Sequence, residues 1–141
     1  MKLLIAYILT IAASLMTAGA ASAEIVARVS TSEQTMQVYV DGELHAVYPV
    51  STARRGYRTP SGNFRPQGFA RYHRSSRYHG SPMPYSVFFH GNYAIHGSYA
   101  TRSLGRPASH GCIRLDPENA REFYHLVRGR GAGQTRIVVG R

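Results

Sequence analysis

The dipeptide Asp41-Gly42 separates two β-prone runs, and it is the strongest local structural signal in the sequence. Met36–Val40 precedes it and Glu43–Val50 follows it. Asp-Gly is typical of a two-residue type I′ turn, because the twist of that turn matches the twist of antiparallel strands. The pattern therefore predicts a β-hairpin and favours a fold built on sheets.

Other short β-prone runs are bounded by turn residues in the same way. The predicted strands are Ile25–Val29, Phe64–Pro66, Tyr85–His90, Tyr93–His96 and Arg136–Val139. Two stretches, Ser51–Pro84 and Gly97–Ala108, show no periodicity and are expected to be loops.

One helix is predicted late in the chain. Asp116 is a good N-cap, and Pro117 suits the first helical position. Phe123, Leu126 and Val127 then fall on one apolar face, and the helix is expected to end near Gly129. The fold class that follows is mainly β: an antiparallel β-sandwich or partly closed barrel with one helix in its C-terminal half.

The first 23 residues have the pattern of a secretion signal. Lys2 is followed by an uncharged run from Leu3 to Ala23, and residues 21–23 (Ala-Ser-Ala) fit a small-residue cleavage site. The predicted organisation is a signal peptide, residues 1–23, followed by a single domain, residues 24–141. The alternative is an uncleaved anchor, since the uncharged run could just span a bilayer. Either form leaves the cytoplasm.

Cys112 is the only cysteine, so one chain can form neither a disulfide nor a cysteine-based zinc site. A cysteine attacks a carbonyl as a thiolate, which a nearby imidazole can generate. His110 would share a face with Cys112 in an extended chain, and His96 ends a predicted strand that could pair beside it. The alternative is a buried cysteine without chemical function.

Two glycines accompany these residues, Gly97 after one histidine and Gly111 before the cysteine. Glycine lets backbone groups approach closely, and consecutive amides around Gly111 and Cys112 could stabilise an oxyanion. The segment therefore indicates a candidate site for acyl transfer by a nucleophilic cysteine.

Ser109–Leu115 (SHGCIRL), preceded by Ile95–Gly97 (IHG), closely resembles the signature of the L,D-transpeptidase catalytic domain, the YkuD family. Two further segments agree. Thr59–Phe64 is similar to the family's Thr-Pro-x-Gly-x-Phe segment, and Met83–Tyr85 is similar to its substrate-side segment. The resemblance extends over roughly Ile25–Val139.

The resemblance implies an enzyme of the periplasm or cell wall that acts on peptidoglycan stem peptides. Cys112 would attack the carbonyl of the third residue of a tetrapeptide stem, D-Ala would leave, and a thioester would form. An amine of a second stem would resolve the thioester as a 3→3 cross-link, or a free D-amino acid would exchange with D-Ala. By the family pattern His96 is the general base and the Gly97 carbonyl orients its ring. No cofactor is implied.

The resemblance also assigns supporting roles around the cysteine. The amides of His110, Gly111 and Cys112 are expected to form the oxyanion hole. Ser109 and His110 are expected to shape the pocket.

Three further side chains are candidate substrate contacts. Arg114 would either pair with a stem carboxylate or hold its loop through a salt bridge. Tyr85 and Tyr93 would either line the cleft or belong to the core or to a strand surface.

The chain is strongly basic: 17 Lys+Arg against 7 Asp+Glu give a formal charge of +10. Arg54–Arg77 contains seven Arg interleaved with Tyr and His. In a cytoplasmic protein this composition would suggest nucleic acid, but export argues against that partner. An anionic wall polymer, stem carboxylates or a phospholipid surface are expected instead. A solvated loop or a lid over the cleft are the alternatives.

No metal site is predicted, because the remaining histidines show no ligand spacing matched to carboxylates. These are His45, His73, His79, His90 and His125.

Several functions share the same acyl-enzyme. Water as the acceptor would give an L,D-carboxypeptidase or an amidase, and a wall-linked lipoprotein is a third acceptor. A non-catalytic, basic wall-binding module with an inert cysteine is the alternative from another class, and the pairing of His96 with Cys112 argues against it. Membrane contact is expected only through an uncleaved N-terminal segment.

Overall fold

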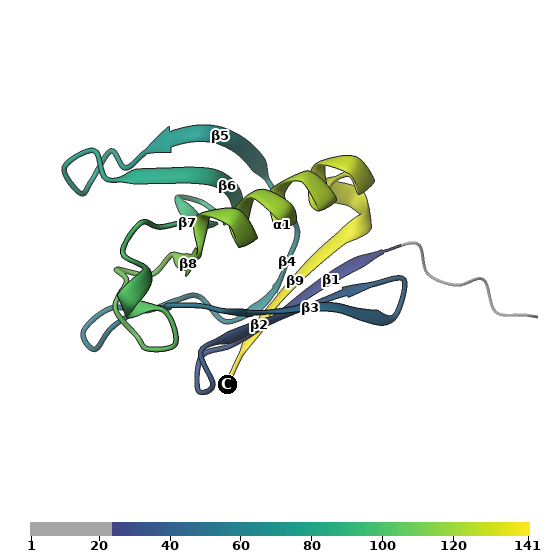
Figure 1. Ribbon diagram of the computed structural model, residues 1–141, viewed down its shortest axis with the longest axis horizontal. Coiled ribbons are helices and arrows are strands. Elements are labelled where there is room, and N and C mark those ends of the chain that lie inside the picture. Colours follow the sequence, from purple (N-terminus) through teal and green to yellow (C-terminus); the bar gives the residue numbers. More distant parts are fainter. Residues whose placement is uncertain (1–23) are drawn as a thin grey trace, which may run out of the picture.

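A computed structural model describes residues 24–141 (Figure 1), and the predicted signal peptide, residues 1–23, lies outside the described residues. Two β-sheets and one α-helix make up the described part, with two single-turn 3₁₀ helices, η1 (Thr101–Ser103) and η2 (Ala132–Gln134). Within residues 24–141, no helix has the length and apolar character needed to cross a bilayer.

The first sheet has five strands in the order β3-β2-β1-β9-β4. Their bounds are β1 Ile25–Ser30, β2 Thr35–Val40, β3 Glu43–Pro49, β4 Gly62–Phe64 and β9 Thr135–Gly140. β1, β2 and β3 are antiparallel neighbours, whereas β9 runs parallel to β1. The last strand of the chain therefore lies beside the first strand of the domain, near the middle of the sheet.

The predicted hairpin is confirmed. Asp41 and Gly42 connect β2 to β3 with φ values of 52° and 83°. Two successive positive φ values define a type I′ turn, and Asp and Gly are among the residues that tolerate them.

The second sheet has four strands in the order β5-β6-β7-β8. Their bounds are β5 Gly68–Arg74, β6 Pro82–His90, β7 Tyr93–Gly97 and β8 Ile113–Leu115. β7 and β8 are parallel, and their register places His96 opposite Arg114. This pairing joins the two segments that carry the candidate site.

The helix α1 (Pro117–Arg130) begins as predicted, because the Asp116 side chain accepts a hydrogen bond from the Glu118 amide at 2.9 Å. Gly131, with φ 92°, ends it. Its buried residues recur at helical spacing and pack against β6 and β7. They are Ala120, Phe123, Tyr124 and Val127.

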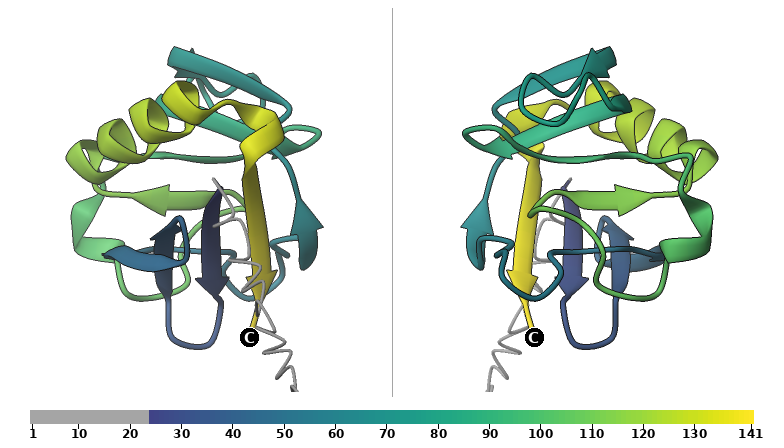
Figure 2. Two further views of the ribbon diagram at one scale, coloured as in Figure 1. Left: turned by 90° about the vertical axis from the view of Figure 1, so that its right-hand side faces the viewer. Right: turned by 90° about the vertical axis from the view of Figure 1, so that its left-hand side faces the viewer.

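One hydrophobic core lies between the two sheets, whose strands run in different directions (Figure 2). Each fully buried Val, Leu, Ile, Phe or Met side chain stabilises the fold by about 1.5–3 kcal/mol. The first sheet contributes Ile25, Val29, Met36, Val38, Ile137 and Val139, and the second contributes Val87, Phe89, Ile95, Ile113 and Leu115.

The predicted fold class is confirmed, with two sheets that do not close into a barrel and with one parallel pair in each sheet. Two strands were not predicted. β5 lies at a sheet edge with mostly exposed or half-exposed side chains, so its sequence lacks apolar alternation, and β8 has only three residues. The predicted strand Phe64–Pro66 is wrong in its bounds, since Pro66 has no amide proton for a ladder and the strand ends at Phe64.

Candidate active site

His96 lies on β7 with only 5% of its surface exposed. Its Nδ1 is 2.7 Å from the carbonyl oxygen of Gly97. A carbonyl oxygen can only accept a hydrogen bond, so Nδ1 carries the proton and Nε2 keeps its lone pair. The ring is therefore held in the tautomer that can accept a proton at Nε2.

Burial lowers the pKa of His96 to about 4. The Gly97 carbonyl opposes this shift by stabilising the N–H, while Arg114 and His73 add to it. The imidazole is therefore neutral at neutral pH, which is the form that a general base requires.

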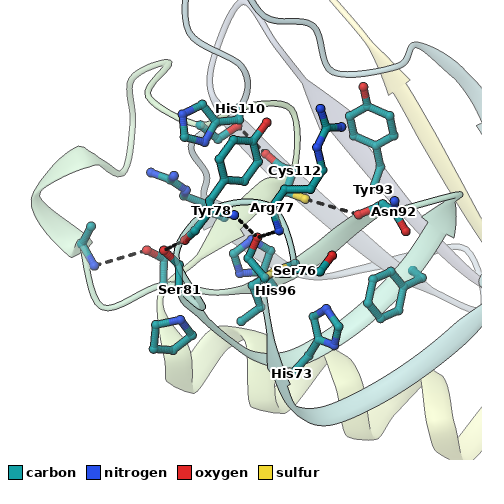
Figure 3. A pocket seen from close by; sticks show the side chains of 18 of the residues that line it. His73, Ser76, Arg77, Tyr78, Ser81, Asn92, Tyr93, His96, His110 and Cys112 are labelled. Carbon is teal, nitrogen blue, oxygen red and sulfur yellow. Dashed lines mark hydrogen bonds between the residues drawn. The ribbon is translucent and has the colours of Figure 1, made fainter.

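Cys112 immediately precedes β8, two residues before the Arg114 that pairs with His96. The pairing of β7 with β8 therefore brings Cys112 close to the strand that carries His96. Figure 3 shows both side chains at the same pocket. The Sγ–H of Cys112 donates to the carbonyl oxygen of Asn92 at 3.8 Å.

The pKa of the Cys112 thiol is raised, chiefly because burial disfavours the thiolate. The Ala94 backbone and Arg114 act in the opposite direction without reversing the shift. A thiol with a raised pKa beside a neutral imidazole is a neutral pair. Little thiolate is therefore present in this pocket at neutral pH.

The loop before Cys112 is fixed by buried hydrogen bonds. The Ser109 hydroxyl donates to the Cys112 carbonyl at 2.6 Å and accepts from the Gly111 amide at 3.0 Å. The Thr59 hydroxyl donates to the Gly111 carbonyl at 2.9 Å and accepts from the Ala53 amide at 3.0 Å. The segment Thr59–Phe64 therefore braces the loop before Cys112 through its first residue.

These bonds correct the expected oxyanion hole. The Gly111 amide already donates to Ser109, so it is not available to a substrate oxyanion in this conformation. The His110 and Cys112 amides donate to no other atom of residues 24–141. They are the two donors that remain for a developing negative charge.

His110, the second candidate base, lies at the mouth of the pocket. Its ring stacks on Tyr78 at 3.9 Å between centroids and meets the edge of Tyr57 at 4.7 Å. Its pKa is lowered, by burial first and then by Arg54 and Arg114. The ring thus packs in the pocket wall, and a catalytic role for His110 stays a prediction.

The pocket has a volume of about 620 Å³ and reaches from Cys112 to the loop 75–81 between β5 and β6 (Figure 3). That loop contributes Arg77 and Tyr78, so part of the predicted Arg-rich segment forms one wall. The loop closes on itself through a bond from the Ser75 amide to the Ser81 carbonyl at 2.9 Å.

The structure separates the three candidate substrate contacts. Tyr93 lines the pocket, whereas Tyr85 does not. The Tyr85 ring packs against α1, 5.5 Å from the Tyr124 ring and 5.8 Å from the His125 ring. A positive φ of 54° at Tyr85 accompanies this placement.

Arg114 lines the pocket and is half-buried. Within residues 24–141 it forms no ion pair, so a salt bridge does not hold its loop. The backbone of Arg114 does that instead, through bonds of 2.9 and 3.0 Å to Ser51.

Sequence reasoning did not identify several residues of the pocket wall. The sequence held a signal for His90 and Asn92. The Gly91-Asn92 turn joins the predicted strand Tyr85–His90 to the predicted strand that ends at His96, so residues at the turn are expected near His96. No periodic signal marks the others. The missed residues are His73, Phe88, His90, Asn92, Ser98 and Tyr99.

Within the described residues, no group of three or more His, Cys, Asp or Glu side chains is arranged to hold a metal ion.

The sequence model of the L,D-transpeptidase catalytic domain, YkuD, matches residues 24–139. Solved structures share the fold. An L,D-transpeptidase from Mycobacterium smegmatis has a TM-score of 0.75 at 23% identity, over 84% of this chain and 59% of that one. One from Mycobacterium tuberculosis H37Rv has a TM-score of 0.72 at 28% identity, over 83% and 57%.

L,D-transpeptidase 3 from Mycobacterium tuberculosis, solved with a faropenem-derived adduct, has a TM-score of 0.73 at 26% identity, over 83% of this chain and 60% of that one. The chain thus spans less than two thirds of the length of these structures. A comparison with curated proteins found no match.

Proposed function

The chain belongs to the YkuD family of L,D-transpeptidase catalytic domains, and we propose that it is an exported cysteine L,D-transpeptidase acting on peptidoglycan tetrapeptide stems. One observation carries the proposal. The only thiol shares a pocket with a neutral imidazole whose Nδ1 proton is fixed by the Gly97 carbonyl.

In the first half-reaction, Cys112 Sγ attacks the carbonyl carbon of the third residue of the stem. His96 Nε2 takes the thiol proton as the S–C bond forms. The tetrahedral oxyanion accepts hydrogen bonds from the His110 and Cys112 amides. The C–N bond to the terminal D-Ala then breaks, and His96 returns the proton to the leaving amine. The product is a thioester on Cys112.

In the second half-reaction, an amine attacks the thioester carbonyl. His96 accepts a proton from this amine, and Cys112 leaves as the thiolate and is reprotonated. A side-chain amine of a second stem gives a 3→3 cross-link, and a free D-amino acid gives an exchanged stem. The pocket suits an acidic substrate, because the described residues of its wall include Arg77 and Arg114 and no Asp or Glu.

Export is part of the same proposal. Its support is the uncharged run and the Ala-Ser-Ala sequence of residues 21–23, directly before the first residue that the family match covers. A periplasmic or cell-wall location would place the enzyme beside its substrate.

Faropenem provides a test of the nucleophile. A penem presents a strained β-lactam carbonyl, so Cys112 should open the ring and retain the drug as a thioester. Intact-mass spectrometry of the purified protein should show one added mass, mapped by peptide digestion to Cys112. Cys112→Ala should add none. An adduct that persists in Cys112→Ala, or no adduct on the wild type, would contradict the assigned nucleophile.

A further inference from the structure

The positively and negatively charged residues of this protein fall in different parts of the sequence. From Leu44 to Leu115 there are ten Arg and no Asp or Glu. All seven carboxylate side chains lie before or after that stretch. Several of them are already engaged: Glu24 with Arg136, Asp41 with Arg130, and Glu122 with His45. The arginines between Leu44 and Leu115 therefore have no carboxylate of their own segment to neutralise them.

Seven of these arginines are exposed and come from the segments around the pocket mouth. We call them the arginine rim. They lie in the β3–β4 loop, at the β5–β6 hairpin end and in the η1 region: Arg54, Arg55, Arg58, Arg74, Arg77, Arg102 and Arg106.

Contacts within the fold hold the three segments together. The Arg54 amide donates a hydrogen bond to the Ser109 carbonyl at 2.9 Å, which joins the β3–β4 loop to the loop before Cys112. The Gly105 amide donates a hydrogen bond to the Val50 carbonyl at 2.8 Å, which joins the η1 region to the residue that follows β3. Tyr78 of the β5–β6 hairpin stacks on His110. Figure 1 shows all three segments at the same end of the molecule.

The rim guanidinium groups keep an unneutralised charge, although Arg74 donates one hydrogen bond to the Gly80 carbonyl at 3.1 Å. Within residues 24–141 none of them forms an ion pair. Arg54 and Arg77 pack over Tyr57 and Tyr78 at 4.9 and 5.8 Å, which supports their side chains without neutralising their charge. A planar guanidinium accommodates a carboxylate through two parallel hydrogen bonds.

We propose that the arginine rim binds the free carboxylates of stem peptides neighbouring the one in the pocket, so that the domain holds the polymer at several points. The inference rests on the proposed function. A single exposed Arg–carboxylate pair contributes little, but several pairs on one polymer act at a high effective concentration. The partner is thus the polycarboxylate substrate itself, engaged beyond the reacting stem.

The test compares polymer binding with single-stem chemistry. Arg55→Gln/Arg102→Gln/Arg106→Gln removes three rim charges from outside the pocket wall. Arg28→Gln/Arg121→Gln/Arg141→Gln removes three exposed charges elsewhere and is the matched control. Co-sedimentation with purified sacculi should give a Kd raised about tenfold or more in the rim variant, and little changed in the control. Added NaCl should weaken wild-type binding, because salt screens exposed charges.

Two further arms identify the ligand. Sacculi with chemically amidated carboxylates should lose wild-type binding, and vesicles of phosphatidylglycerol should bind more weakly than unmodified sacculi. The proposal is overturned if the rim variant binds like the wild type, if amidation has no effect, or if the vesicles bind more tightly. Exchange of D-Ala on a soluble disaccharide-tetrapeptide is measured in parallel and should be equal in all three proteins. Its absence from the wild type would instead overturn the proposed function.

Discussion

His96→Ala should lower the rate at which Cys112 is acylated at neutral pH by about 10² to 10⁴. The reason is that burial raises the pKa of the thiol, so little thiolate exists without a base to take its proton. Stopped-time mass spectrometry of faropenem acylation measures this rate directly. In the variant the rate should rise steadily with pH, because hydroxide can then remove the proton that His96 no longer accepts.

The wild type provides the complementary pH profile. The pKa of His96 is lowered to about 4, so the base stays unprotonated as the pH falls from 7 to 5. The acylation rate should therefore lose its His96-dependent part only near pH 4, rather than near the ordinary histidine pKa of about 6.5. His73→Ala and His110→Ala remove other imidazoles of the same pocket and should lower the rate far less. Full activity of His96→Ala would move the role of base to His110.

Gly111→Ala should both destabilise the domain and suppress acylation. A Cβ on Gly111 would lie 2.4 Å from Tyr93 Cε1 and 2.8 Å from the Arg58 carbonyl oxygen, at a φ of 138° that L-residues rarely adopt. Steric overlap and backbone strain together should cost on the order of 3 kcal/mol. The Gly111 amide and carbonyl form hydrogen bonds with the hydroxyls of Ser109 and Thr59. A shift of the Gly111 backbone would therefore also move Cys112. Urea unfolding measures the stability, and faropenem acylation measures the loss of reactivity.

Gly105→Ala is the matched control for this substitution. Gly105 also has a positive φ, 91°, but nothing lies within 4 Å of the Cβ that would be added. Gly105→Ala should lower the free energy of unfolding only by the backbone strain and should leave acylation near the wild-type rate. The variant Gly111→Ala/Tyr93→Ala should recover part of the stability, since only the Arg58 contact and the strain remain. Equal free energies of unfolding for Gly111→Ala and Gly105→Ala would show that the close approach of Tyr93 and Arg58 to Gly111 does not affect stability.

Much of this architecture follows from local sequence. The Asp41-Gly42 turn and the Asp116 cap are short-range signals, and the structure confirms both. The parallel pairing of β9 with β1 and of β8 with β7 has no such signal, because it joins segments far apart in the chain. β8 is too short to be recognised by pattern, yet its pairing with β7 brings Cys112 and His96 to one pocket.

The candidate site divides in the same way. The motif around Cys112 identifies residues that the structure brings to one pocket, including His96 and Arg114. Sequence could not show that the Gly111 amide is taken by Ser109, or that Tyr85 turns toward α1. Both depend on side-chain packing between distant segments. The arginine rim also depends on the fold, since its residues span Arg54 to Arg106 and meet only through loop contacts.

The most direct test of the proposed function is transfer of a D-amino acid onto a stem peptide. Purified protein would be incubated with tetrapeptide muropeptides and excess D-methionine, and the products would be identified by mass spectrometry. The expected result is replacement of the terminal D-Ala by D-methionine with the wild type and no replacement with Cys112→Ala. Tripeptide products alone would mean that water resolves the acyl-enzyme, and unchanged tetrapeptides with the wild type would contradict L,D-transpeptidase activity.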